Sequence, residues 1–190
     1  HFHLDHVSGL HILLKFDLDK GLFICGGKGA RGYIAALLRR PFSVPLDKLR
    51  YPAKVLELPA RLKELPFKCS CLPLEHSDPV LGYRFEVDGR TVAFCTDTGY
   101  CANAVKLASG ADLLISECTY LPGEETPGWP HMNPEKAAAL AEAAGASRLA
   151  LAHFEPNKYP TRRKRVWAAA QARRTFRNVF AASDGDRILL

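Results

Sequence analysis

The feature that most constrains this chain is its beginning, where residues 1–6 read His-x-His-x-Asp-His. Three imidazoles and one carboxylate within six residues form a set of metal ligands. If the run leaves the end of a strand, alternation places His1 and His3 on one side. A turn into a helix would then bring Asp5 and His6 to a neighbouring position. The run therefore predicts ligands for two adjacent metal ions. A frayed terminus or a tag remnant is the alternative, but an apolar helix pattern follows directly.

The composition predicts one ordinary globular domain over residues 1–190, with 47% hydrophobic and 24% charged residues. The chain has no apolar run of membrane-spanning length and no signal-peptide pattern, so we expect a cytoplasmic protein with no membrane partner. The six cysteines form no C-x-x-C pair, which favours reduced core thiols over a disulfide framework. A strand is expected before residue 1, so the N-terminal strands of the domain are predicted to be missing from this chain.

Periodic apolar patterns predict an α/β chain. Asp88-Gly89 predicts the tight turn of a hairpin, Asn133-Pro134 predicts a helix start, and a later Asp-Gly pair predicts a hairpin that closes the chain. The expected helices are 7–16, 33–40, 102–108, 134–145 and 161–178; the expected strands are 22–25, 54–58, 67–74, 80–87, 91–95, 113–116, 148–152, 179–182 and 187–190.

Side chains with metal-binding or acid–base chemistry stand at the ends of several expected strands. His76, Asp97 and His153 each follow one strand, and Glu117 ends another. Rigid backbone at one edge of a sheet can hold ligands in place. Any one of these residues is more often a capping or loop residue, but their shared position indicates one site.

The complete pattern resembles the metallo-β-lactamase superfamily, in which the opening run is followed by a lone histidine, an aspartate and a late histidine. The resemblance covers essentially the whole chain and implies the four-layer αβ/βα sandwich of that superfamily. It also implies the metal ligands: His1, His3 and His76 for the first ion, Asp5, His6 and His153 for the second, and Asp97 as the bridge between them.

Two divalent metal ions are therefore the expected cofactor. Imidazole and carboxylate ligands suit Zn²⁺, with Mn²⁺ or Fe as alternatives. Two metals about 3.5–4 Å apart can hold a bridging hydroxide and neutralise anionic oxygens of a substrate. Asp5 is expected both to bind metal and to orient this hydroxide.

Two further residues resemble the ribonuclease Z branch of the superfamily. Glu117, in the run Ser-Glu-Cys-Thr-Tyr, looks like the acidic motif of that branch, and His131 looks like its His-Ser-Thr motif. That branch pairs the two residues, which implies that Glu117 holds His131 protonated as the acid for the leaving group. The segment 153–159 also looks like the late-histidine motif of the branch. A surface histidine beside a flexible loop is the alternative for His131.

The chain departs from ribonuclease Z in three places. Residues 104–106 lack the proline and arginine of a Pro-x-Lys-Val-Arg pattern. Only 20 residues lie between His76 and Asp97, which leaves no room for the arm that clamps transfer RNA. Met132 and Asn133 replace the serine and threonine beside the acid. These departures favour a compact relative, such as a phosphodiesterase for small cyclic phosphates, over transfer-RNA 3′ processing.

The positive charge is concentrated near the C-terminus, where residues 156–180 hold eight basic residues and no acidic one. The helix expected there could bind nucleic-acid phosphates. The preferred interpretation is a solvated face with Val166, Trp167 and Phe176 packed inward, since charge runs need no partner. The G-x-G-x-x-G match at 27–32 is interpreted as turn glycines, because no acidic residue ends a second strand at the spacing of a dinucleotide site.

The sequence therefore predicts a binuclear-metal-dependent hydrolase, preferably a phosphodiesterase for a cyclic nucleotide, a small phosphodiester or an RNA end. Two alternatives stay open. One is an ester, lactone or thioester hydrolase on the same metals, and the other is a non-catalytic nucleic-acid-binding protein that uses the basic helix. A homodimer is a further expectation, since relatives of this kind are often dimers.

Overall fold

The structure is a computed structural model that describes all residues from 1 to 190. Backbone contacts divide the chain into two compact units, His1–Pro66 and Phe67–Leu190, which are described one at a time. Both units combine strands with helices, so the α/β class expected from the sequence is confirmed. The single domain expected from the length stays a prediction. None of the helices has the length and apolar character needed to cross a membrane.

The first unit is built on two parallel strands, β1 (Leu22–Gly26) and β2 (Ala53–Glu57), which are joined through helix α2 (Ala30–Leu37). Its core centres on Leu13, Ile34 and Leu38. The remaining elements of this unit are α1 (Leu4–Val7), the 3₁₀ helices η1 (Ser8–Lys15), η2 (Leu46–Lys48) and η3 (Leu62–Glu64).

The helix expected at 7–16 differs in type from the prediction. One α-helical turn, α1, gives way to the 3₁₀ helix η1. A 3₁₀ helix has three residues per turn, so side chains three apart share a face. Leu13 is buried with Leu10 packed beside it, whereas Leu14 is 43% exposed. An α-helix over 7–16 is expected to place Leu10, Leu13 and Leu14 on one face, and this expectation is therefore wrong for Leu14.

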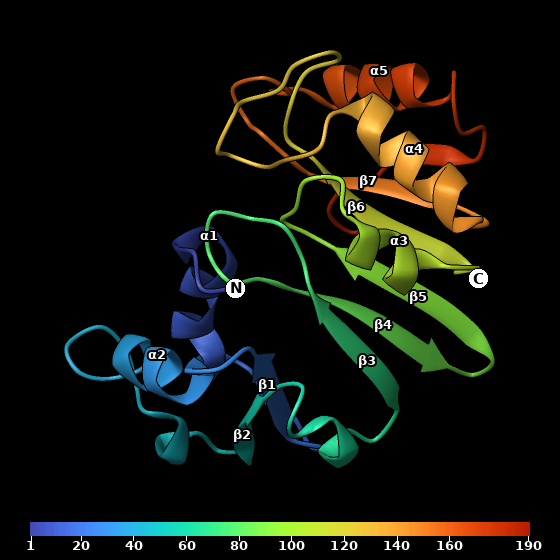
Figure 1. Cartoon of the computed structure of the whole chain (residues 1–190). Helices are drawn as coiled ribbons and strands as arrows, with labels where there is room; N and C mark the ends of the chain where they lie inside the picture. Colours follow the sequence, from blue (N-terminus) through green and yellow to red (C-terminus); the bar gives the residue numbers. More distant parts are fainter. The chain divides into compact units, whose positions relative to one another are not determined.

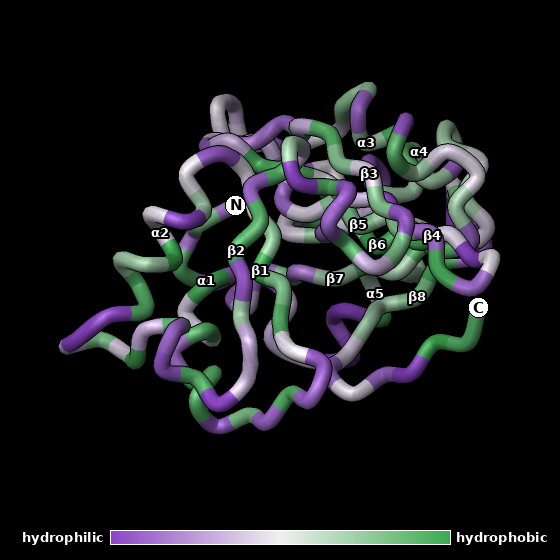
Figure 2. Tube along the Cα trace, turned by 90° about the horizontal axis from the view of Figure 1, so that it is seen from below, coloured by the Kyte–Doolittle hydropathy of each residue, from purple (hydrophilic) through white to green (hydrophobic).

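The second unit contains a six-stranded sheet whose strands follow in chain order from β3 to β8. The first three strands are antiparallel, and β5 to β8 are parallel. Figure 2 shows hydrophobic colour around β5 and β6 in the middle of this sheet. The strands are β3 (Lys68–Pro73), β4 (Leu81–Val87), β5 (Arg90–Cys95), β6 (Leu113–Cys118), β7 (Leu149–Phe154) and β8 (Val179–Ala181).

The three helices of this unit, α3 (Ala102–Ala108), α4 (Pro134–Ala144) and α5 (Arg162–Ala172), each connect two neighbouring parallel strands. Because successive right-handed crossovers advance in one direction, the helices cover one face of the sheet. Figure 1 shows them side by side there. Their buried positions are mostly alanine, which lets the helices approach the strands closely; Leu114, Leu140 and Leu149 fill the core between them.

Three expectations near the C-terminus are wrong. Strand β8 pairs in parallel with β7, and residues 187–190 form no strand, so the closing hairpin is absent. Helix α5 ends at Ala172 and not at residue 178. After Ala172 the chain turns back, and Arg173 Nη2 donates to Val179 O at 2.9 Å. Of the three side chains expected to pack inward, Phe176 packs against the core, but Val166 and Trp167 are 48% and 40% exposed. The buried face of α5 is made of alanines instead.

Three of the six cysteines, Cys71, Cys95 and Cys118, are buried. Burial raises the pKa of both Cys95 and Cys118 to about 12. These two thiols therefore stay protonated at neutral pH and offer no thiolate to a metal or an oxidant.

The core of the second unit predicts a large effect for one truncation. Replacing the fully buried Leu149 with alanine is expected to lower the free energy of unfolding by about 2–5 kcal/mol. Leu189 is 91% exposed, and Leu189→Ala is the matched control with an expected change within about 0.5 kcal/mol. Urea unfolding followed by circular dichroism measures both. Equal effects of the two substitutions would contradict the burial of Leu149.

Candidate metal centre

Four functional side chains of the second unit lie at one edge of its sheet. Strands β3 and β5 run in the same direction because each is antiparallel to β4, and β5, β6 and β7 are parallel. Their carboxyl ends therefore share an edge. His76 follows β3 and Asp97 follows β5, while Glu117 and His153 each lie one residue before the end of β6 and β7. The structure thus brings together the strand-end residues that the sequence singled out in this unit.

Asp97 lies between two histidines. Its Oδ2 is 4.0 Å from His76 Nε2, and its Oδ1 is 3.3 Å from His153 Nε2. The side chains of His76 and Asp97 are nearly completely buried, whereas that of His153 is 31% exposed. One carboxylate therefore directs one oxygen toward each imidazole, which is the arrangement that a bridging ligand requires.

His153 reaches this position through a β-bulge. In the register between β6 and β7, Glu117 pairs with Ala152 and Cys118 pairs with Phe154, so His153 is the extra residue. Its φ of 46° lies in the left-handed region, which costs a non-glycine residue about 1–3 kcal/mol. Bulges re-aim side chains in this way next to functional sites.

Glu117 and His131 form a buried acid–histidine pair. His131 Nδ1 lies 2.7 Å from one oxygen of Glu117 and 2.9 Å from the other. The same carboxylate accepts the backbone N–H of Thr98 at 2.7 Å and that of Met132 at 3.2 Å. Because a carboxylate with these donors acts only as an acceptor, we assign the shared proton to His131 Nδ1. The pair fixes the orientation of the imidazole and directs Nε2 away from Glu117.

The second unit's donors fit a divalent metal ion. His76, Asp97 and His131 each place one donor atom within 4.8 Å of the others. Imidazole nitrogens and a carboxylate oxygen are the ligands that Zn²⁺ prefers. Histidines that bind zinc commonly donate their second ring N–H to a carboxylate, as His131 does to Glu117.

The first unit carries its own group of ligand-type side chains. His1 Nε2 and His3 Nδ1 are 2.9 Å apart, and the ring centroids of His1 and His6 are 4.3 Å apart. His3 has an extended backbone and directly precedes α1, so the chain turns into a helix where the sequence predicted. Asp5 lies in this first turn, with Oδ2 3.4 Å from His6 Nε2. Because the two groups belong to different units, the seven-ligand binuclear centre stays a prediction.

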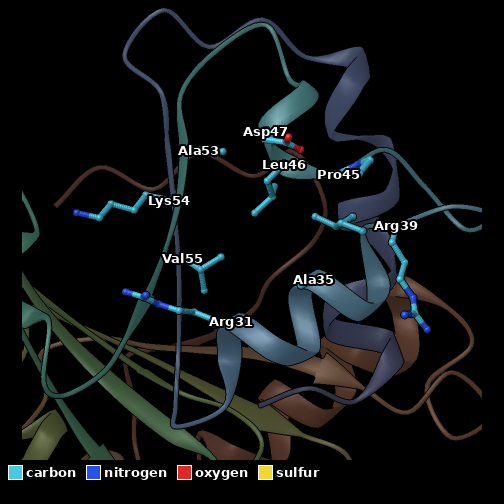
Figure 3. A pocket seen from close by; sticks show the side chains of 10 residues that line it. Arg31, Ala35, Arg39, Pro45, Leu46, Asp47, Ala53, Lys54 and Val55 are labelled. Atoms are coloured by element: carbon cyan, nitrogen blue, oxygen red, sulfur yellow. The ribbon is translucent and has the colours of Figure 1, made fainter.

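The first unit also contains a pocket of about 530 Å³ (Figure 3). It is formed by α2, η2 and β2, and Ala35, Leu46 and Val55 line it. None of the predicted site residues borders this pocket. It therefore plays no part in the candidate centre.

A smaller pocket of about 220 Å³ in the second unit does border the centre, because His131 lines it together with Trp129 and Tyr100. The sequence interpretation assigned no role to these two aromatic residues. The available signal was a tryptophan in the Pro- and Gly-rich loop directly before His131. The hydrogen bond from the backbone N–H of Thr98 to Glu117 could not be predicted from the sequence, because nearly every residue type has a backbone N–H.

Comparisons with known proteins agree with this geometry. Residues 1–154 match the family described as Beta-lactamase superfamily domain. Ribonuclease Z of Acaryochloris marina (strain MBIC 11017) is 43% identical over 74 residues, which are 38% of this chain and 24% of that protein. The matched stretch thus spans about a quarter of the length of such curated relatives.

Solved structures show the same fold. Human tRNase Z, short form, is 26% identical with a TM-score of 0.61, over 81% of this chain and 70% of that chain. The metallo-beta-lactamase fold protein YhfI from Bacillus subtilis is 23% identical with a TM-score of 0.76, over 98% and 73% of the two chains. The family match includes every predicted metal ligand from His1 to His153. This protein therefore belongs to the beta-lactamase superfamily and has the metallo-β-lactamase fold.

Proposed function

We propose that this protein is a metal-dependent hydrolase that cleaves phosphodiesters. The observation that carries the proposal is the buried Glu117–His131 pair, with a donor atom of His131 within 4.8 Å of donor atoms of His76 and Asp97. An alkoxide that leaves a phosphodiester needs a proton, and a histidine held by a carboxylate is suited to supply it. Similarity to ribonuclease Z supports the same reaction class.

The metal ligands follow from the sequence resemblance and from the donors of the second unit. We take the cofactor to be two divalent ions, preferably Zn²⁺, with Mn²⁺ or Fe as alternatives. The ligands would be His1, His3, Asp5, His6, His76, Asp97 and His153. Bound there, the metal would supply a hydroxide nucleophile at neutral pH and neutralise the charge of the phosphate. Asp5 would orient the nucleophile.

The protein itself supplies the proton for the leaving group. Glu117 holds His131 Nδ1–H, so the ring cannot rotate and Nε2 keeps one direction. When the ring is doubly protonated, the negative charge of Glu117 stabilises it. Nε2–H then donates to the leaving oxygen, and Nδ1 keeps its proton throughout.

The test is hydrolysis of bis-(p-nitrophenyl) phosphate by purified protein loaded with Zn²⁺ or Mn²⁺. We expect turnover that a chelator abolishes and that added metal restores. The same preparation is compared on p-nitrophenyl acetate and on a lactone, because an ester hydrolase is the alternative on this site. Cleavage of the esters with no cleavage of the phosphodiester would contradict the proposal and favour that alternative.

The surface of α5 supports RNA as a second class of substrate, or nucleic-acid binding as a second function. Arg162 and Arg163 are exposed at its start, and Lys164 Nζ lies 5.4 Å from the centroid of the half-exposed Trp167 ring. An aromatic ring among cations is suited to stack on bases of single-stranded nucleic acid. RNA binding that falls steeply with salt and survives metal removal would favour the non-catalytic role.

A further inference from the structure

We infer that the pocket beside His131 receives the leaving group, and that the leaving group is a nucleoside whose base stacks on Trp129. The inference rests on the proposed function, because it names the alcohol released in the same reaction. It assigns to Trp129 a role in substrate specificity that sequence motifs do not indicate.

The position of the pocket follows from the acid. His131 lines the pocket, and an acid must lie within hydrogen-bond reach of the leaving oxygen. The atoms beyond that oxygen therefore extend away from the metal ligands and toward the space that His131 borders. The volume of about 220 Å³ is below the range of about 300–1,000 Å³ for drug-sized ligands, so one ring system with its sugar is the appropriate size.

The wall of this pocket offers aromatic surface next to the reacting centre. Trp129 is 49% exposed, and its ring centroid is 6.1 Å from those of both His76 and His131. Tyr100, which is 42% exposed, lines the same pocket. An exposed ring at this distance from the acid can stack on a flat group attached to the leaving oxygen through a sugar.

The loop that carries Trp129 is held in place before any ligand binds. Tyr120 Oη donates to Trp129 O at 2.8 Å, and Trp129 N donates to Thr126 O at 3.2 Å. Gly99 allows close approach on the other side, because a Cβ there would lie 3.0 Å from the Pro130 Cβ. A loop ordered in advance loses less entropy when a ligand binds.

The charges that line the pocket favour a neutral ligand. Glu75 and Glu125 contribute two carboxylates, against one ammonium group from Lys136, which lies 2.9 Å from Glu125. This excess of negative charge opposes a second phosphate, whereas carboxylates accept hydrogen bonds from sugar hydroxyls and base N–H groups. The leaving group is therefore a nucleoside and not a nucleotide.

Fluorescence tests the binding without requiring catalysis. The chain has two tryptophans, so Trp167→Phe leaves Trp129 as the sole indole emitter. We expect adenosine to quench this emission with saturation and ribose at the same concentration to leave it unchanged. Absence of saturable quenching by adenosine, or equal quenching by ribose, would overturn the inference.

Kinetics test the role in turnover, with the methyl phosphodiester of adenosine as substrate. Metal-loaded protein is expected to release adenosine and methyl phosphate in preference to methanol and the nucleotide. Trp129→Ala should lower kcat/KM for adenosine release by roughly tenfold or more, the effect of losing one base–aromatic stack. Trp129→Phe should retain most of this rate. Phe42→Ala, which removes an exposed ring that lies in no candidate site, should leave it unchanged. Preferential release of methanol would refute the assignment.

The two proposals fail in different ways. If bis-(p-nitrophenyl) phosphate is hydrolysed and adenosine does not bind, the phosphodiesterase stands and the nucleoside pocket is wrong. If adenosine quenches Trp129 and no phosphodiester is hydrolysed, the pocket stands and the proposed reaction is wrong.

Discussion

Replacing His131 with asparagine is expected to lower the turnover of a phosphodiester with an alkoxide leaving group by about 10²–10⁴-fold. The amide of the new side chain can still donate to Glu117, so the buried carboxylate keeps a partner. What is lost is the titratable nitrogen that gives a proton to the leaving oxygen. Steady-state kinetics on the methyl phosphodiester of adenosine measure the effect.

The size of the loss should depend on the leaving group. A p-nitrophenolate is stable as an anion and leaves without a proton, so His131→Asn should slow the hydrolysis of bis-(p-nitrophenyl) phosphate much less. A residue that only positioned the substrate would slow both reactions alike. Equal losses on both substrates would therefore contradict the role of His131 as an acid.

Two controls separate this role from other causes. His11 is an exposed histidine of η1, and His11→Asn should leave both rates unchanged. Metal analysis of His131→Asn should give the same metal content as the unaltered protein. A loss of metal in this variant would show that His131 is a ligand, which its position near His76 and Asp97 also permits.

Asp97→Asn is expected to remove bound metal and, with it, hydrolysis. Residues that hydrogen-bond to metal ligands each contribute about 10–100-fold to metal affinity. Asp97 faces two imidazoles as a ligand, so its loss should lower metal affinity by at least about 100-fold. An amide can offer one oxygen but cannot carry the negative charge that binds two cations. Metal content after dialysis, measured by atomic emission, tests this expectation.

Asp112→Asn is the matched control. Asp112 accepts the backbone N–H of Thr91 at 2.8 Å, directly before β6 and therefore at the opposite end of that strand from Glu117. The Thr91 N–H and the nearby Arg90 hold the pKa of Asp112 below its usual value, so this aspartate is also charged at neutral pH. We expect Asp112→Asn to keep its metal. Full metal content in Asp97→Asn would refute the assignment of Asp97 as a ligand.

Features set by neighbouring residues could be predicted from the sequence. The hairpin turn forms at Asp88-Gly89, where both residues adopt positive φ as a tight turn requires. Helix α4 begins after Asn133, whose side chain accepts the N–H of Lys136 at 2.8 Å. These signals were correct because each turn or cap is stabilised within four residues of chain.

Features that depend on distant partners could not be predicted in this way. The Asp-Gly pair near the C-terminus predicted a hairpin, but β8 pairs in parallel with the buried first half of β7. The sequence predicts a helix at 7–16, but the 3₁₀ form of this helix and the exposure of Leu14 depend on packing within the unit. The outward position of Trp167 follows from alanines that bring α5 close to its neighbours.

The sequence by itself determined that His76, Asp97 and His153 stand at strand ends of the second unit, because residue type and strand pattern are local properties. It also indicated the family, through the run at residues 1–6 and its distant partners. Only the tertiary structure decided that Glu117 also accepts the backbone N–H of Thr98, that a bulge turns His153 toward Asp97, and that Trp129 lines the pocket beside His131. These relations depend on sheet register and loop path, which are set by contacts between residues far apart in the chain.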